Sequence, residues 1–463
     1  MSVLAFKTLP ELGRMIRSGA VSPIQLATEA LERLDSVGRS LNAVVSLTDG
    51  HGLEQARVAE DELSHGVDRG PLHGIPYGAK DLLATAGIPT SWGIGPLSNQ
   101  MFESDAAVIE RLRDAGAVLV AKLSMVEGAG GFGYEQPDAS FTGPGRNAWN
   151  PDAWAGGSSS GSGSAVGSGC LPFAIGTETW GSILTPASFN GVSGFRPTYG
   201  SVSRRGAMAL SWTMDKIGPI CRTAEDCSIA LAVISGHDPE DPTTRQGWFE
   251  AGKSKREGYR FAVLENAAVD AQPAVRANFE ASLEALESIG SLRPVSLPEL
   301  PWDAAASLVV ISEAASAFEE FILSDSAQEL SAPEDRVGLL HGLTVPAVDY
   351  LRALRVRRIG SRALDDVLTG FDAIVAPTLP IVATPIDESF ESWFAASRGP
   401  SLGGAGNLCG LPAITVPNGF GDRGLPTGLE FMGRAYDDGL VLGAAMRFQE
   451  LTNWHQSVPG AGK

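Results

Sequence analysis

The chain of 463 residues can bury a large core, since 43% of its residues are hydrophobic and only 19% are charged. Its formal net charge of −19 argues against nucleic acid or an anionic membrane as a partner, because both require clustered Lys and Arg. It has neither a long apolar run of the kind that spans a membrane nor an evident signal peptide, so we expect a cytoplasmic protein.

Cysteine and histidine residues give no sign of a metal site. The four cysteines match no zinc-binding spacing, and the six histidines are scattered without a close pair. We therefore expect reduced, mostly buried thiols and no bound metal.

The first segment of the chain reads as helical. Ser22, Pro23 and Gln25 form a capping-box pattern, and apolar residues then recur at helical spacing up to Leu34. A second helix is expected over residues 55–64. No linker-like stretch follows, so we expect residues 1–65 to pack on the core instead of forming a separate domain.

From about residue 71, predicted helices and strands alternate. Strands are expected at 117–121, 171–175, 259–264 and 371–376, and helices at 106–114 and about 275–286. This alternation favours a layered α/β sheet within one domain over residues 1–463. Residues of about 238–345 are richer in charge and helix formers, which predicts a more helical lobe beside the sheet, over the active site.

A serine- and glycine-rich segment covers residues 156–169. Its composition is typical of a flexible linker, but the apolar residues 171–175 that follow favour a packed loop and helix, and both interpretations stay open. A nucleotide-binding loop is disfavoured, because no strand precedes the segment and no phosphate-binding lysine follows it.

The next segment, residues 176–184, predicts a strand that runs into a turn carrying Ser182. Such a turn displays a serine at the end of a strand, and the N–H groups near a helix start can hold an oxyanion. Trp180 breaks the GxSxG elbow pattern, and a strand–turn–serine by itself is more often structural than catalytic.

Taken together, these segments resemble the amidase signature family. The family has a Gly-Gly-Ser-Ser stretch and a second serine loop whose catalytic serines are 24 positions apart, and Ser158 and Ser182 have this separation. Its upstream Gly-Ile-Pro-x-x-x-Lys-Asp motif is matched by residues 74–81. Residues 194–200, 376–378, 407–417 and 424–429 are also family-like, so the resemblance covers nearly the whole chain.

The resemblance implies a fold and a set of roles. The fold would be one mixed β-sheet sandwiched between layers of α-helices. Ser182 would be the nucleophile, Ser158 a bridging serine after a cis peptide bond, and Lys80 the base. The backbone N–H groups of Thr179, Trp180, Gly181 and Ser182 would form the oxyanion hole.

The chemistry of such a triad sets one requirement. A serine is a weak nucleophile until a base takes its proton, and a lysine can do so only when it is neutral. Its reference pKa of about 10.4 must fall by several units through burial. The acyl-enzyme route needs no metal or organic cofactor. A surface Lys80–Asp81 pair is the alternative for the lysine alone.

The sequence departs from the common family pattern around the nucleophile. Glu178 stands in place of aspartate, Trp180 in place of a small glycine, and Leu184 in place of arginine. Leu184 is expected to contact the substrate and to disfavour a carboxylate on it. Further upstream, Ala129, Gly130 and Gly131 occupy a stretch that lines the substrate site in relatives, although an ordinary turn is an equal alternative.

These observations predict a serine hydrolase that cleaves the C–N bond of small neutral apolar or aryl amides. Anilides, esters and carbamates (urethanes) offer the same acyl chemistry. Its partners would be the substrate and water, with oligomeric state undetermined. The alternative is the amide-cleaving component (the A chain) of a glutamine-dependent tRNA amidotransferase complex, and a non-catalytic scaffold is a third hypothesis, disfavoured because all three triad residues are present.

Overall fold

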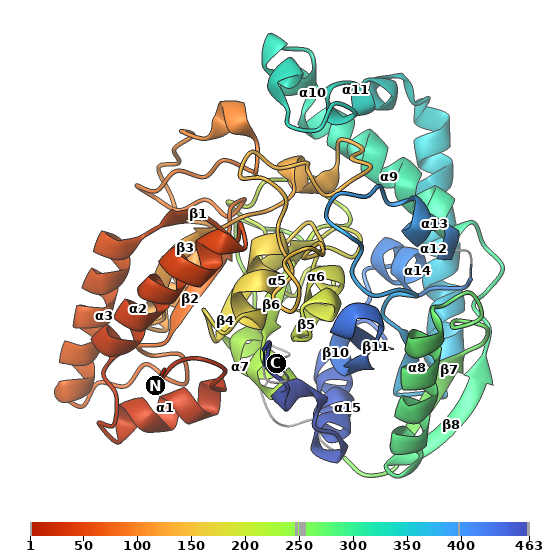
Figure 1. Cartoon of the computed structure of the whole chain (residues 1–463). Helices are drawn as coiled ribbons and strands as arrows, with labels where there is room; N and C mark the ends of the chain where they lie inside the picture. Colours follow the sequence, from red (N-terminus) through yellow and green to blue (C-terminus); the bar gives the residue numbers. More distant parts are fainter. Residues whose placement is uncertain (1, 246–248, 250–255, 397–398, 461–463) are drawn as a thin grey trace.

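A mixed β-sheet of 11 strands runs through the computed structural model, which describes residues 2–245, 249, 256–396 and 399–460 (Figure 1). The strands lie in the order β1-β3-β2-β4-β6-β5-β10-β11-β9-β7-β8. They are β1 (Val44–Leu47), β2 (Pro76–Lys80), β3 (Val118–Leu123), β4 (Phe173–Glu178), β5 (Ser193–Arg196), β6 (Lys216–Cys221), β7 (Tyr259–Leu264), β8 (Gly290–Val295), β9 (Ala373–Pro377), β10 (Ala413–Phe420) and β11 (Pro426–Met432).

Helices surround this sheet, which confirms the predicted fold class (Figure 1). The pair α5 and α6 packs on the central strands, and so does the pair α7 and α15. The helices are α1 (Leu9–Arg17), α2 (Pro23–Arg33), α3 (Asp49–Ser64), α4 (Ala107–Asp114), α5 (Ser160–Gly167), α6 (Leu184–Phe189), α7 (Ala224–Ile234), α8 (Pro273–Glu287), α9 (Trp302–Ala317), α10 (Glu319–Ile322), α11 (Asp335–Gly338), α12 (Ala347–Leu368), α13 (Glu391–Ala396), α14 (Gly403–Leu408) and α15 (Asp438–Leu451).

The strands and helices expected from the sequence are present. The four predicted strands correspond to β3, β4, β7 and β9, and the predicted helices to α2, α3, α4 and α8. At the start of α2, the Ser22 hydroxyl accepts from the N–H of Gln25, and the Gln25 side chain accepts from the N–H of Ser22, so the predicted capping box is formed. In the range 238–345, β7 and β8 extend the sheet, while α9, α10 and α11 lie towards one end of the molecule (Figure 1).

The serine- and glycine-rich segment forms a helix in the core, so the linker interpretation is wrong. Every residue of α5 is buried. A Cβ on Gly161 would lie 2.3 Å from the Ala43 carbonyl oxygen, and one on Gly163 would lie 2.8 Å from that of Pro186. The hydroxyl of Ser162 donates to the carbonyl of Ile175 at 3.3 Å. Small residues are required here because neighbouring backbones approach the helix closely.

The pairing of β2 with β4 prepares the site. The two strands are parallel, with Gly78 opposite Ala174 and Ala79 opposite Ile175. Carboxyl ends of parallel strands meet at one edge of a sheet, so Lys80 and Glu178, the last residues of these strands, lie at the same edge.

Membrane-spanning helices and metal-binding clusters are both absent from the described residues. None of the described helices is long and apolar enough to cross a membrane. No group of His, Cys, Asp and Glu side chains within the described part of the chain could hold a metal ion.

Candidate functional site

Lys80 lies fully buried at the end of β2 and contacts Ser158. Its Nζ donates to Ser158 Oγ at 2.7 Å and to Thr177 Oγ1 at 2.9 Å. The peptide bond between Gly157 and Ser158 is cis. Two of the three predicted triad residues are therefore in direct hydrogen-bond contact.

The environment of Lys80 favours its neutral form. Burial lowers the pKa of the ammonium group to about 7, although the carboxylates of Asp215 and Glu178 act in the opposite direction. The neighbouring Asp81 does not pair with Lys80, because its side chain lies 3.3 Å from Lys122 Nζ and accepts the N–H of Ser91 at 2.9 Å. Near neutral pH a large fraction of Lys80 can thus accept a proton.

Ser182 lies next to the Ser158 segment, in the turn between β4 and α6. The N–H of Ser159 donates to the Ser182 carbonyl at 3.2 Å, which joins the two serine segments through the backbone. Within the described residues the Ser182 hydroxyl has no hydrogen-bond partner. A nucleophile that is free before substrate binds is common in enzymes without ligand, where catalytic hydrogen bonds form only in the complex.

Glu178 fixes the turn that carries Ser182. Its Oε2 accepts the N–H groups of Ile183 at 2.9 Å and Leu184 at 3.0 Å, and its Oε1 accepts from Arg196 Nη1 at 2.8 Å. Burial acts to raise the pKa of Glu178, but the charges of Arg196 and Lys216 and these hydrogen bonds hold it at about 2. The ionised carboxylate therefore caps α6 from inside the core.

The expected oxyanion-hole segment is held from both sides. Thr179 Oγ1 donates to Asp215 at 2.6 Å, and Lys216 Nζ donates to the Thr179 carbonyl at 3.2 Å and to Asn407 at 2.8 Å. Gly181 has a positive φ of 85°. The N–H groups of Trp180, Gly181 and Ser182 have no partner among the described residues, so they remain available for an oxyanion.

Ser182 opens into a cavity of about 570 Å³. Trp180, Leu184, Ala129 and Gly130, which were expected near the substrate, all line it. Gly131 does not; a Cβ on this residue would lie 2.2 Å from Leu210, which does line the cavity.

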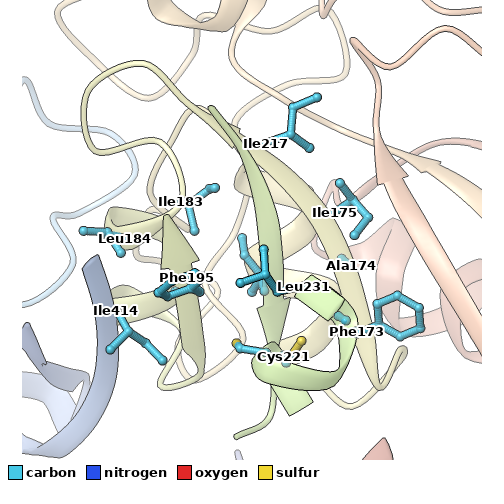
Figure 2. Close-up of a cluster of buried hydrophobic side chains, with 14 of the residues drawn as sticks. Phe173, Ala174, Ile175, Ile183, Leu184, Phe195, Ile217, Cys221, Leu231 and Ile414 are labelled. Atoms are coloured by element: carbon cyan, nitrogen blue, oxygen red, sulfur yellow. The ribbon is translucent and has the colours of Figure 1, made fainter. Parts of the chain in front are cut away.

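The two unusual residues of the nucleophile turn point in different directions. Trp180 is 37% exposed, and its indole nitrogen lies 3.2 Å from where a Cβ would stand on Gly403. Leu184 is 4% exposed and packs in the hydrophobic cluster that also contains Phe195 and Ile414 (Figure 2). Trp180 therefore presents an aromatic surface to the cavity, while most of Leu184 belongs to the core.

The cavity wall at residues 128–130 has a special backbone. Gly128, Ala129 and Gly130 all have positive φ, with values of 54°, 57° and 81°. A Cβ on Gly128 would lie 1.9 Å from the ring of Phe132, so glycine is required there. The wall is thus a tightly packed left-handed turn.

Several polar residues of the site were not identified as such from the sequence. They are Thr177, Arg196, Asp215, Lys216, Asn407 and Glu430. Arg196 supplies a buried guanidinium beside the nucleophile turn, where Leu184 had suggested that a cation was missing. Arg196 and Asn407 lie in stretches that are family-like, but only their pairing across strands shows what they contact.

The comparisons with known proteins agree with this geometry. The family model described as Amidase matches residues 25–442. The chain belongs to the amidase signature family. Members of this family act on amide C–N bonds, and this chain is accordingly an enzyme of that type.

The names of individual relatives point to different activities. The chain is 33% identical to the A subunit of glutamyl-tRNA(Gln) amidotransferase from Chloroflexus aurantiacus, over 99% of both chains. A solved structure of a vestigial protein complex, which reveals the evolutionary origins of an s-triazine catabolic enzyme, contains a chain of the same fold. This chain superposes on it with a TM-score of 0.88 at 28% identity, covering 96% of this chain and 98% of that one. The peptide amidase of Stenotrophomonas maltophilia gives a TM-score of 0.83 at 30% identity, covering 96% and 97%.

These relatives correct one expectation from the sequence. Limiting the partners to a small amide and water is wrong, because the amidotransferase relative is named as one subunit of a larger enzyme. The physical reason is that net charge is a sum over the whole surface. A net charge of −19 does not prevent one face of a protein from binding a partner.

Proposed function

We propose that this chain is the amide-cleaving subunit of a glutamine-dependent amidotransferase, and that Ser182, Ser158 and Lys80 are its catalytic residues. The observation that carries the proposal is the hydrogen bond from buried Lys80 to Ser158, in the segment joined to Ser182. The A subunit of glutamyl-tRNA(Gln) amidotransferase from Chloroflexus aurantiacus matches 99% of this chain. This match supports an enzyme that works with other subunits.

The reaction that these residues support begins with the hydroxyl of Ser182. Ser182 Oγ attacks the side-chain carbonyl carbon of glutamine, while its proton passes to Ser158 Oγ and the Ser158 proton passes to neutral Lys80. The N–H groups of the segment Thr179 to Ser182 would stabilise the negative oxygen of the tetrahedral intermediate.

The second half of the reaction reverses the proton path. As the C–N bond breaks, the proton returns from Lys80 through Ser158 to the leaving nitrogen, which departs as ammonia. In the amidotransferase reaction, this ammonia would be used by the partner subunits. Water then attacks the acyl-enzyme ester and releases glutamate and free Ser182.

The direct test measures ammonia and glutamate formed from L-glutamine by the purified chain, alone and together with the proteins that copurify with it. We expect stoichiometric glutamate and ammonia, and a higher rate in the complex. Loss of the Ser182 hydroxyl should abolish both products. Absence of glutamine cleavage by the chain and its complex would contradict the proposal.

A second candidate function is hydrolysis of a neutral apolar or aryl amide, with anilides, esters and carbamates as related substrates. One specific observation favours it: Trp180 lines the cavity together with apolar side chains that include Leu210, Val310 and Leu379. Burying an apolar acyl group against them stabilises the complex by roughly 25 cal/mol per Å². Faster cleavage of an anilide than of glutamine would support this candidate over the first.

A further inference from the structure

Asp215 ties the expected oxyanion-hole segment to the turn that precedes β6. Thr179 Oγ1 donates to Asp215 Oδ1 at 2.6 Å. The other carboxylate oxygen, Oδ2, accepts the N–H groups of Leu210 and Ser211, each at 2.9 Å. The position of Thr179 therefore depends on where the turn of residues 210–215 lies.

Glu313 of α9 holds the same turn from the outside of the site. Its side chain is buried, with 5% exposure. Its Oε2 accepts the hydroxyl of Ser211 at 2.5 Å and the N–H of Thr213 at 3.0 Å, and its Oε1 accepts the hydroxyl of Thr213 at 2.8 Å. Because hydrogen bonds to a carboxylate are stronger than those to a neutral acceptor, these three bonds fix the turn to α9.

Two further contacts show what would remain without Glu313. Tyr350 of α12 donates to Glu313 Oε1 at 2.7 Å, so this fourth bond joins α9 to α12 and does not reach the turn. The turn has a contact of its own on another side, where the Trp212 carbonyl accepts from the hydroxyl of Tyr199 at 2.8 Å. Loss of Glu313 should therefore release the turn from α9 without detaching it from the fold.

Glu313 has no direct contact with the reacting groups. It does not line the cavity that contains Ser182, as the structure describes that cavity. Asp215, in contrast, acts on the base itself, because its carboxylate raises the pKa of Lys80 against the effect of burial. A displaced Asp215 would change two properties together, the geometry of the oxyanion hole and the pKa of the base.

We propose that Glu313 is a positioning residue for amide cleavage, which holds the oxyanion-hole segment in place through the turn of residues 210–215 and Asp215. Glu313 fixes the turn, the turn fixes Asp215, and Asp215 fixes Thr179 before substrate arrives. The N–H groups of residues 180–182 then meet the developing oxyanion without reorganisation, which makes such donors effective. This role applies to any amide substrate and does not depend on glutamine.

The test measures how fast a fluorophosphonate labels Ser182, since this reaction uses the base and the oxyanion hole but not the natural substrate. Ser182 Oγ bonds to phosphorus, fluoride leaves, and the serine proton passes towards Lys80. We expect Glu313→Ala to lower the labelling rate constant about 10- to 100-fold. Glu313→Gln should recover most of the rate, because its amide can still accept from Ser211 and donate to the hydroxyl of Thr213.

The pH dependence of labelling separates positioning from a loss of stability. In wild type the rate should rise with a midpoint near the Lys80 pKa of about 7. Glu313→Ala should lower this midpoint by about 0.5 pH unit or more, because a displaced Asp215 favours the charged form of Lys80 less. Glu313→Gln should keep the midpoint of wild type, since it removes the charge of Glu313 but not the position of the turn. An unchanged rate or an unchanged midpoint in folded Glu313→Ala would overturn the positioning role.

Tyr350→Phe is the matched control, because it removes the bond to α12 and leaves the three bonds to the turn. It should keep both the rate and the midpoint of wild type. If Tyr350→Phe slows labelling as much as Glu313→Ala does, Glu313 acts through the packing of α9 on α12 and the proposal is wrong.

A double variant tests the route through Asp215. In the Asp215→Asn background, Glu313→Ala should slow labelling by less than about a further twofold, because both changes release the same segment. A further loss as large as in wild type would mean that Glu313 does not act through Asp215. Should Glu313→Ala not fold, Thr213→Val removes one of the three bonds and should lower the rate and the midpoint in the same direction; no change in either would contradict the proposal.

Discussion

The nucleophile turn and the neighbouring pair of side chains, Arg196 and Glu430, are two polar regions that differ in how their groups are paired. In the turn, both oxygens of Glu178 are hydrogen-bonded and Thr179 is bonded through its hydroxyl and its carbonyl. In the second region, the buried atoms Glu430 Oε1 and Arg196 Nη2 have no partner among the described residues. The paired groups hold the geometry of the turn before substrate arrives, and they leave the Ser182 hydroxyl and the N–H groups of residues 180–182 free to act on it.

The largest expected effect comes from removing the nucleophile of the paired turn. Ser182→Ala should lower kcat for amide cleavage about 10⁴-fold, because no other hydroxyl can form the acyl-enzyme. Circular dichroism and the melting temperature should stay close to those of wild type, since Ser182 lies at the cavity surface. A serine-directed fluorophosphonate should label wild type at Ser182, and activity near wild type in the folded variant would contradict the assignment.

Breaking the support of the turn should have the next largest effect. Glu178→Gln removes the charge that faces Arg196, and losing one partner of a buried ion pair costs about 3 to 5 kcal/mol of stability. We expect this loss in urea unfolding at pH 7, with kcat lowered about 100-fold, because a displaced turn is costly to catalysis.

The stabilisation that Glu178 provides should depend on pH in the direction set by its lowered pKa. The pKa of Glu178 is lowered from 4.5 to about 2 in the folded enzyme, so the stabilisation is present above pH 4.5 and is lost as the pH falls towards 2. The difference in stability between wild type and Glu178→Gln should therefore shrink in acid. A constant difference from pH 7 to pH 3 would mean that Glu178 is not ionised in the fold.

At pH values below its pKa, the titration of Lys80 should change kcat/KM about tenfold per pH unit. With a pKa of about 7, the neutral base increases about tenfold from pH 5 to pH 6 and is nearly complete above pH 8. We expect kcat/KM for pentanamide, which does not itself titrate, to rise along this curve and then level off. Lys80→Arg should stay inactive throughout, because arginine keeps its proton; a steady fall above pH 7 in folded enzyme would contradict Lys80 as the base.

The smallest effect is expected from Trp180, which lines the cavity. Trp180→Ala removes apolar surface that an acyl group can contact, so kcat/KM for an anilide should fall about threefold to tenfold relative to pentanamide. An unchanged ratio would show that the exposed indole does not contact the substrate. Leu184→Ala is the useful companion, because it tests a side chain that lies mainly in the core.

The sequence was most informative where its signals are local. The motif around Lys80 and the spacing of Ser158 and Ser182 indicated three residues that the fold brings to one edge of the sheet. The capping box of α2 and the apolar face of α8 were likewise readable, since both depend on neighbours within a few residues.

What the sequence could not predict depends on pairing between distant strands. The strand β2 was not expected, because Pro76 and Gly78 are poor strand formers and only burial between β3 and β4 explains it. The contact of Arg196 with Glu178 requires the order β4-β6-β5, which no local pattern contains. Glu430 lies on β11, a strand with glycine and proline that alternation rules also pass over.

The links between Arg196 and Leu411 and between Lys216 and Asn407 join parts of the chain that are 215 and 191 residues apart. The nucleophile turn is thus held by acceptors that are synthesised long after the turn itself. A nascent chain can fold β2, β3 and β4 early, but Arg196 and Lys216 lack these partners until residues 407–411 have packed beside the sheet. Appearance of amidase activity during refolding should therefore lag behind the formation of secondary structure, and it reports closure of the whole sheet.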